Sequence, residues 1–490
     1  MSAINTLYLN TYVLMNVIPV RVQQTLQKLK KTLQHNVEIH VISGGFYVYR
    51  ASSIYDKVKK KPRKTTEYIG SISKDGTFKP KNVHTTIPIS KREIFEYANG
   101  VLAYEYIKDI EVLLKKYTPF YRELIAFALV KVLDPKPIRL ISSRWEKLDI
   151  SKSYAVNLSP KHLGEVIHAI GSEVSWWYAL YTELAANDDL IFYDLTAIMT
   201  YSESIKLAEK GYNAKKDKHD QIGVSLAFST ASNLPIGCEV SYGSERDIKT
   251  IKNFLARFPK NNLGLILDRG FASIPLIQEL LARGIHYLVP LKKNFKIIPP
   301  PPFHWDNAFF YRDRPIMYTV YPTEYGTLYL FKDPLLKGER EATILKNVIK
   351  KGFNSQEYEK QCELTGIIPI LSDLMMTPPE IFLHYKERED VELAFEALKN
   401  AIDSDKAYLQ SPESVRGYFF ISLLALRIYF KVLKNLRILN LNQIISVEEV
   451  FFELSKVEMI YESNNRKSLA QIPKRAEEIF GYFESDIPMG

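Results

Sequence analysis

Four residues suited to binding phosphate and metal ions recur at helical spacing between positions 385 and 399. On one helix of about 3.6 residues per turn they share a face; they are Tyr385, Arg388, Glu392 and Lys399. A carboxylate can hold a metal ion, while cations and a phenol suit phosphate oxygens. The adjoining face is apolar and would pack on a core; it carries Val391, Ala394, Phe395 and Leu398. A solvated helix laced with ion pairs would carry similar charges, so this segment alone does not decide its role.

Two aspartates stand where short apolar runs stop. Residues 190–193 precede Asp194, and residues 263–267 precede Asp268. Side chains converge at strand ends in an α/β sheet, so these aspartates and Glu392 could meet at one point. Three carboxylates repel one another unless cations neutralise them, and two Mg²⁺ ions about 3.5–4 Å apart would do so. We expect Mn²⁺ to substitute. The alternative is that each aspartate caps the turn or helix that follows it.

A dense basic run lies between two expected strands near the N-terminus. Six of the eight residues from 57 to 64 are cations, namely Lys57, Lys59, Lys60, Lys61, Arg63 and Lys64. We expect a loop that contacts the phosphate backbone of double-stranded DNA. A solvated hairpin loop would have the same composition, but the net charge of +9 and the pI of about 9.0 favour DNA.

The pattern Y-x2-R-x3-E-x6-K that starts at Tyr385 resembles the signature of DDE transposases of the insertion-sequence-4 group. Two further segments are similar to the acidic motifs of that family, Y-D-L-T at 193–196 and L-D-R-G-F-A-S at 267–273. Residues 282–289 match the sequel of the second motif. The N-terminal segment from Tyr47 to Gly70 looks like that of the subgroup with larger transposases. Residues 216–223 and 411–426 also look familial, so the resemblance covers most of the chain.

The resemblance implies a role for each matching residue. Asp194, Asp268 and Glu392 would be the catalytic carboxylates that bind the metals. The residues that position the phosphates of the transposon end would be Tyr385, Arg388 and Lys399. The implied reaction is cut-and-paste transposition, in which a dimer binds terminal inverted repeats, cleaves the ends and joins the 3′-hydroxyls to target DNA.

The chain departs from the family pattern at three places, none of which removes a metal ligand. The family usually has histidine where Tyr418 stands, and a tryptophan often stands at the position of Glu389. The segment 243–247 lacks the usual Gly-Asn pair. Two alternatives therefore stay open, a degenerate transposase that only binds DNA and a metal-dependent nuclease of the same fold. A scaffold protein with no role at nucleic acids would bind DNA weakly and with little salt dependence.

The order of expected elements indicates an α/β fold. From residue 186, three strands are followed by helix, strand, helix and strand, which is the order of a ribonuclease-H-like domain. We therefore expect six regions: a basic β-rich DNA-binding region (1–92), a helical region (93–185), the first part of a ribonuclease-H-like core (186–293), a β-rich insertion (294–378), the second part of the core (379–430) and a helical C-terminal region (431–490).

Composition predicts a soluble, intracellular globular protein, and the resemblance implies a location in the prokaryotic cytoplasm, associated with the nucleoid. The 490 residues are 46% hydrophobic and 25% charged, as in ordinary globular chains. Two cysteines cannot build a disulfide framework or a four-thiolate zinc site. The apolar run at 418–430 contains Arg427 and is too short to span a bilayer, so we expect a buried helix and no membrane partner.

Overall fold

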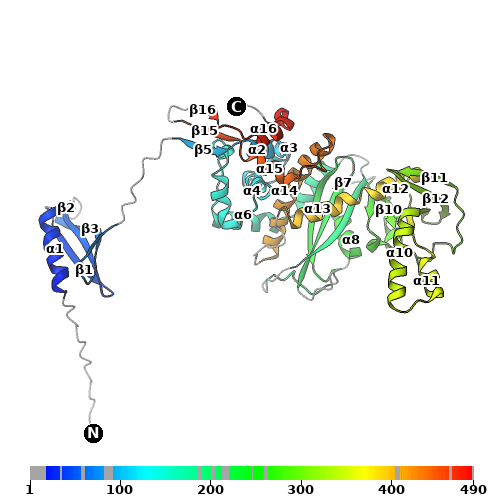
Figure 1. The fold of residues 1–490 in the computed structure, drawn as a ribbon, viewed down its shortest axis with the longest axis horizontal. Helices are drawn as coiled ribbons and strands as arrows, with labels where there is room; N and C mark the ends of the chain where they lie inside the picture. Colours follow the sequence, from blue (N-terminus) through cyan, green and yellow to red (C-terminus); the bar gives the residue numbers. More distant parts are fainter. Residues whose placement is uncertain are drawn as a thin grey trace, which may run out of the picture. The chain divides into compact units, whose positions relative to one another are not determined.

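The computed structural model divides the chain into two compact units, Met1–Lys91 and Arg92–Gly490, here called the N-terminal unit and the main unit (Figure 1). It describes residues 18–33, 36–56, 61–81, 92–185, 190–199, 205–211, 220–245, 247–258, 263–402, 409, 411–462 and 466–487. The finer division into six regions stays a prediction.

The N-terminal unit is a four-stranded antiparallel sheet covered by one helix. Its elements are α1 (Val20–Leu33), β1 (Val37–Ile42), β2 (Gly45–Asp56), β3 (Lys61–Ile72) and β4 (Phe78–Pro80), with strand order β1-β2-β3-β4. Alternation places Val37, Phe46 and Val48 on one sheet face, where they form a small core with Val22 of α1. The opposite face is open to solvent and carries polar and aromatic residues.

The second half of the basic run lies in a strand and not in the loop that the sequence predicts. Lys61, Arg63 and Lys64 belong to β3 and are exposed. The strand begins earlier than expected because residues 61–64 pair with residues 53–56 of β2. Lys57, Lys59 and Lys60 lie outside the described residues.

Helices fill the first part of the main unit. They are α2 (Ala98–Glu105), α3 (Lys108–Tyr117), α4 (Tyr121–Leu133), α5 (Ile141–Trp145), α6 (Pro160–Ser172) and α7 (Ser175–Leu184). Figure 1 shows α4 and α6 beside the long helix α14 (Pro412–Ile438), on which both pack. A Cβ atom on Gly417 would stand 2.0 Å from the carbonyl oxygen of Ile167, so glycine permits the close crossing of α14 and α6.

A nine-stranded mixed sheet forms the centre of the main unit. Its order is β11-β12-β13-β14-β10-β9-β6-β7-β8. The neighbours β10–β9 and β9–β6 are parallel, and the other neighbouring strands are antiparallel. The bounds are β6 (Leu190–Met199), β7 (Gln221–Ser229), β8 (Leu234–Tyr242), β9 (Gly264–Leu267), β10 (His286–Pro290), β11 (Asn307–Tyr311), β12 (Arg314–Thr323), β13 (Gly326–Lys332) and β14 (Ile367–Ser372). The chain is thus a mixed α/β protein, as expected.

Helices α8 to α13 accompany the sheet strands in the described part of the chain. They are α8 (Asp247–Arg257), α9 (Ile274–Ala282), α10 (Pro334–Lys350), α11 (Ser355–Cys362) and α12 (Pro378–Lys386), followed by α13 (Glu389–Lys399). Because α10 and α11 fall inside residues 294–378, this segment contains helices as well as strands and is not simply β-rich. Its strands extend the central sheet rather than forming a separate one.

The C-terminal region is not purely helical either. It contains α15 (Val447–Leu454) and α16 (Lys474–Tyr482), together with β15 (Glu458–Tyr461) and β16 (Lys467–Leu469). β15 pairs with β16 and with β5 (Glu93–Glu96), so the two ends of the main unit share a three-stranded sheet.

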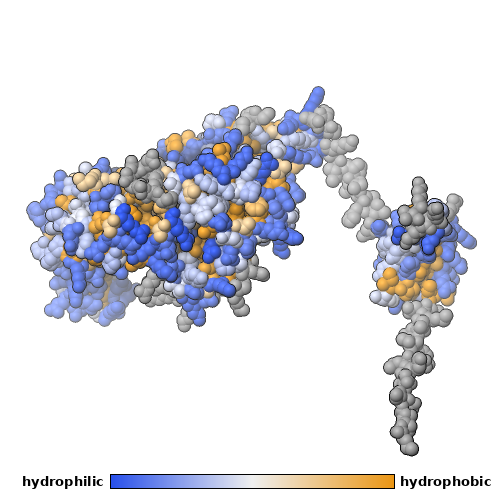
Figure 2. Space-filling model, turned by 180° about the vertical axis from the view of Figure 1, so that it is seen from behind, coloured by the Kyte–Doolittle hydropathy of each residue, from blue (hydrophilic) through white to orange (hydrophobic). Residues whose placement is uncertain are grey.

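The visible surface of the main unit is mostly hydrophilic, with small hydrophobic patches between charged side chains (Figure 2). Within the part of the chain that the structure describes, no helix combines the length and the apolar character needed to cross a membrane.

Candidate active site

Asp194 lies in the middle of a strand, not at its end. β6 continues to Met199 and pairs with β7 from Ile191 to Met199, with Asp194 opposite Leu226. The expectation that the strand stops at the aspartate is therefore wrong, because ladder hydrogen bonds to β7 outweigh the poor strand propensity of one acidic residue. The side chain of Asp194 is half-buried, and its Oδ1 accepts a hydrogen bond from the backbone N–H of Leu195 at 2.8 Å.

Asp268 follows directly after the parallel neighbour of that strand. The last pair of the β6–β9 ladder joins Tyr193 and Leu267, so Asp194 and Asp268 occupy the next position on adjacent strands. Neighbouring strands are about 4.8 Å apart, which brings the two carboxylates to one place. Asp268 also caps the short 3₁₀ helix Arg269–Phe271, since its Oδ2 accepts a hydrogen bond from the N–H of Gly270 at 3.4 Å.

Glu392 reaches this place from α13, but not from the single helix that the spacing predicts. The chain forms α12 up to Lys386 and begins α13 at Glu389, so the predicted continuous helix is wrong. Glu387 and Arg388 at the junction keep right-handed helical backbone angles. The side chains on either side of the break therefore keep nearly the phase of one helix.

The predicted apolar face of α13 is present. Four of its side chains are buried in the main core: Val391, Ala394, Phe395 and Leu398. Their burial turns the opposite side of α13, with Glu392 exposed, toward solvent.

Arg388 connects the two halves of the acidic site. Its guanidinium donates from Nη1 to Oδ1 of Asp268 and from Nη2 to Oε1 of Glu392, the latter at 2.8 Å. Arg388 also stands over the ring of Tyr385, with Cζ 5.7 Å from the ring centroid. A single cation thus balances carboxylates that would otherwise repel each other.

The charges around Arg388 act on pKa values in opposing directions. Burial lowers the pKa of the guanidinium, but the attraction of Asp268, Tyr385, Glu392 and Asp194 outweighs it and raises the pKa above its ordinary value. Burial raises the pKa of Tyr385, although the positive charge of Arg388 counteracts part of the effect. Arg388 therefore stays charged, and Tyr385 stays a neutral phenol that can donate a hydrogen bond.

Lys399 belongs to the same cluster through a contact that sequence reasoning missed. Its Nζ donates to the hydroxyl of Thr196 at 2.7 Å, and Thr196 stands two residues beyond Asp194 on β6. Residues two apart in a strand point to the same face, so this contact fixes the end of α13 beside the aspartate. The two-residue spacing of Asp194 and Thr196 could have indicated this contact in the sequence, but only if the strand had been predicted to continue past Asp194.

A second missed residue supports the chain just after α13. Lys131 of α4 is 2% exposed, and its Nζ donates to the carbonyl oxygen of Ile402 at 3.1 Å and to the hydroxyl of Tyr418 at 2.8 Å. The ammonium also lies 4.0 Å from the centroid of the Tyr418 ring. A lone lysine inside an otherwise apolar helical run was the signal for this buried tether.

The three carboxylates are oxygen ligands of the kind that Mg²⁺ prefers, so the donor set fits this ion. Within the described residues, however, no three Asp, Glu, His or Cys side chains are grouped as a ready metal site. The carboxylates of Asp268 and Glu392 are held apart because the guanidinium of Arg388 lies between them. The site thus combines carboxylates, which attract cations, with a guanidinium, which pairs with carboxylates or phosphates.

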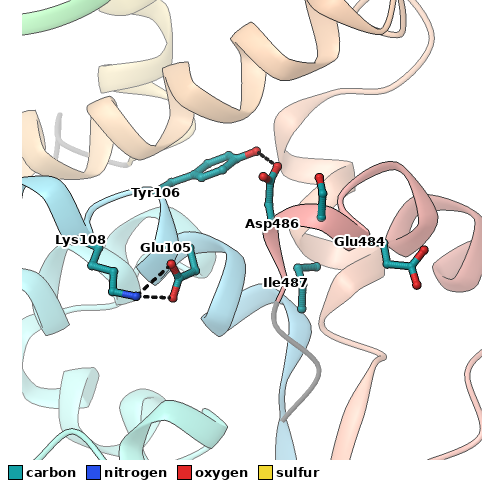
Figure 3. A pocket seen from close by; sticks show the side chains of 7 residues that line it. Glu105, Tyr106, Lys108, Glu484, Asp486 and Ile487 are labelled. Atoms are coloured by element: carbon teal, nitrogen blue, oxygen red, sulfur yellow. Dashed lines mark hydrogen bonds and ion pairs between the residues drawn. The ribbon is translucent and has the colours of Figure 1, made fainter.

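A pocket of about 670 Å³ lies away from these residues (Figure 3). Glu105, Tyr106 and Lys108 line one side, and Asp486 faces them from the C-terminal segment. Figure 3 shows that its polar groups pair with each other: Lys108 with Glu105, and the Tyr106 hydroxyl with Asp486. None of the predicted catalytic residues lines the pocket. The pocket is therefore separate from the candidate active site.

The main unit is thus a mixed α/β body whose sheet and one helix bring acidic side chains to a bridging arginine. Residues 186–428 match the family described as a transposase DDE domain, and this part of the chain belongs to that family. The predicted membership among DDE transposases is confirmed, whereas the insertion-sequence-4 subgroup is not. A search of curated proteins found no match.

Among solved structures, the chain is similar to the piggyBac transposase in a cryo-EM structure of its synaptic complex with hairpin DNA. The sequence identity is 12% and the TM-score is 0.34. The similarity covers 80% of this chain and 76% of that chain.

Proposed function

We propose that the chain is a DNA transposase that cleaves the ends of an insertion sequence and joins the freed 3′-hydroxyls to target DNA. One observation carries this proposal. Asp194 and Asp268 occupy matching positions on adjacent parallel strands, and Arg388 ties Asp268 to Glu392. The whole arrangement falls within the segment that belongs to the transposase DDE family.

The strand order supports a ribonuclease-H-like catalytic core. In β8-β7-β6-β9-β10, the first three strands are antiparallel neighbours and the last two run parallel to β6. Residues 294–378 then form an insertion between β10 and the helix pair α12–α13.

Two Mg²⁺ ions, or Mn²⁺ in their place, would activate the attacking oxygen and stabilise the leaving oxygen of the phosphate. Asp194, Asp268 and Glu392 would hold them. Arg388 would then exchange its carboxylates for a phosphate oxygen, since a guanidinium binds either group through two parallel hydrogen bonds. Lys399 and the neutral phenol of Tyr385 would hold the same DNA end in line.

The charge distribution supports DNA as the partner. The N-terminal unit contains 15 Lys and Arg against four Asp and Glu, a net charge of +11. The main unit contains 50 against 52, a net charge of −2. Recognition of the transposon ends would therefore depend mainly on the N-terminal unit, with its basic run at 57–64. A homodimer would bind the paired terminal inverted repeats. The reaction would take place in a prokaryotic nucleoid.

A cleavage-and-joining assay tests the proposal. A labelled duplex carrying the end of the element that encodes this chain is incubated with Mg²⁺ or with EDTA, using wild type, Glu392→Gln and Glu389→Gln. Glu389 is a matched control because it lies on the same helix, is exposed and loses the same charge. Metal-dependent nicking and joining that Glu392→Gln loses and Glu389→Gln keeps would support a transposase.

Other outcomes separate the alternatives. Nicking without joined products would indicate a metal-dependent nuclease. Binding without nicking by wild type would indicate a degenerate copy that only binds DNA. Equal activity of wild type and Glu392→Gln would refute the assignment of the third carboxylate.

A further inference from the structure

Part of the β2–β3 hairpin extends beyond the rest of the N-terminal sheet. β1 pairs with β2 only as far as Arg50, and β4 pairs with β3 only at residues 70–72. Residues 52–56 and 61–65 pair with each other, from Ser52 opposite Thr65 to Asp56 opposite Lys61. These two stretches, here called the β-arm, form five pairs and are roughly 17 Å long at about 3.3 Å per residue.

The β-arm lacks the apolar cover that the rest of its sheet has. α1 and the small core of the unit contact other residues, namely Val37, Phe46, Val48 and Ile72. Ile54 and Tyr55 at the end of β2 are each 61% exposed. A two-stranded ribbon is only marginally stable in water, so a partner that covers these side chains would stabilise it.

Both faces of the β-arm combine a cation with an apolar side chain. Directly paired residues of an antiparallel ladder point to the same face, so Ile54 shares a face with Arg63. On the other face, Lys64 stands beside Tyr55, whose partner in the ladder is Pro62. A protein partner would cover only one face of the ribbon. A ribbon inside a DNA groove is contacted on both faces, because the groove has two walls.

The charge of the unit indicates a polyanion. Its net charge of +11 exceeds that of the whole chain, +9, while the main unit is close to neutral. The major groove of B-DNA is about 12 Å wide and about 8.5 Å deep, and it admits a two-stranded ribbon. The β-arm is long enough to cross that depth and leave the body of the sheet outside.

We propose that the β-arm enters the major groove of double-stranded DNA. Arg63 and Lys64 contact phosphates on opposite walls, and Ile54 and Tyr55 meet base edges, where an apolar surface can contact the methyl group of thymine. The inference rests on the proposed function for its choice of DNA, but it concerns binding and not cleavage.

The first test compares the contribution of the β-arm cations to DNA affinity with that of the α1 lysines. Full-length protein in EDTA, which prevents cleavage, is used to select duplexes from a random-sequence library, and affinity is measured by fluorescence anisotropy at several salt concentrations. The arm variant Lys61→Ser/Arg63→Ser/Lys64→Ser is compared with a control that removes three exposed lysines of α1, Lys28→Ser/Lys30→Ser/Lys31→Ser. We expect at least a tenfold loss for the arm variant, with a salt slope smaller by about 0.9 per lost phosphate contact, and a loss below about threefold for the control. Equal losses would overturn the proposal.

The second test identifies the groove. Guanine N7 faces the major groove and adenine N3 the minor groove, so each is methylated in the selected duplex before binding. We expect N7 methylation to block binding and N3 methylation to leave it intact; the reverse would overturn the proposal.

The third test separates base contacts from phosphate contacts. Ile54→Ser/Tyr55→Ser should bind the selected duplex no better than a scrambled one while keeping the wild-type salt slope. Full retention of sequence preference would refute a base-reading arm, as would equally tight binding of the separated single strand. Because none of these measurements needs catalysis, they stand even where the cleavage assay of the proposed function fails.

Discussion

Glu239 on β8 offers a prediction whose size follows from the structure. Its side chain is only 13% exposed, and burial raises the pKa of its carboxyl group to about 7, from an ordinary value of 4.5. Arg257 stands 3.6 Å away and opposes the shift, but it is 56% exposed and therefore well screened by water. Glu245 adds to the upward shift. Burial decides the balance, so about half of the Glu239 carboxyl groups carry a proton at pH 7.

The sign of the stability effect follows from the direction of this shift. A carboxyl group whose pKa is higher in the folded state binds its proton more tightly there. The proton on Glu239 therefore contributes fully to the free energy of unfolding below pH 4.5, and this contribution is lost as the pH rises through about 7. At about 1.36 kcal/mol per unit, the shift amounts to about 3 kcal/mol at pH 8.

Glu239→Gln mimics the protonated form at every pH. It should be more stable than wild type by less than about 1 kcal/mol at pH 5 and by about 3 kcal/mol at pH 8. For a unit of about 400 residues this difference raises the melting temperature by about 3–4 °C. Differential scanning calorimetry at both pH values measures it.

Glu279→Gln is the control of opposite sign. A hydrogen bond from Lys252 lowers the pKa of Glu279, with help from Arg283, so its contribution is present at pH 8 and lost in acid. This variant should melt below wild type at pH 8. Were Glu239→Gln to give no larger advantage at pH 8 than at pH 5, the attraction of Arg257 would outweigh burial and the reasoning would fail.

Three further perturbations test the packing and the site. Gly417→Ala should destabilise the protein by about 1–3 kcal/mol because the new Cβ meets the Ile167 carbonyl, whereas Gly164→Ala, with open space around it, should be neutral or slightly stabilising in thermal unfolding. Lys131→Met should cost about 1–3 kcal/mol in denaturant unfolding, since two acceptors lose their buried donor. Arg388→Gln should bind Mn²⁺ several-fold more tightly, as measured by electron paramagnetic resonance, because the cation that occupies the carboxylates is gone; unchanged or weaker binding would contradict this.

Sequence patterns located the acidic residues better than the elements that carry them. The buried runs before Asp194 and Asp268 predicted adjacent strands, because continuous apolar segments are typical of a sheet covered on both faces. They did not reveal that β6 continues to Met199, since an acidic residue inside a strand is indistinguishable from one after it. Pairing with β7 decides the matter.

The break before α13 was also invisible in the sequence. The residues from Tyr385 to Lys399 include no glycine or proline. The break arises because the two helices dock on different partners. Phe382 of α12 packs against Phe309 and Phe331 within residues 294–378, whereas α13 packs on β6. Tertiary contacts, not helix propensity, set this boundary.

The small sheet that joins the ends of the main unit has a consequence for biosynthesis. β5 ends at Glu96, but its partner begins only at Glu458. At about 5–20 residues per second, a ribosome needs roughly 20–70 s to make the intervening chain. The N-terminal unit has its own core and can fold during that interval, while the sheet of β5, β15 and β16 cannot form until the last strands emerge. A chain whose synthesis ends before β15 would therefore contain the proposed β-arm in a folded unit but would lack the sheet that joins the two ends of the main unit.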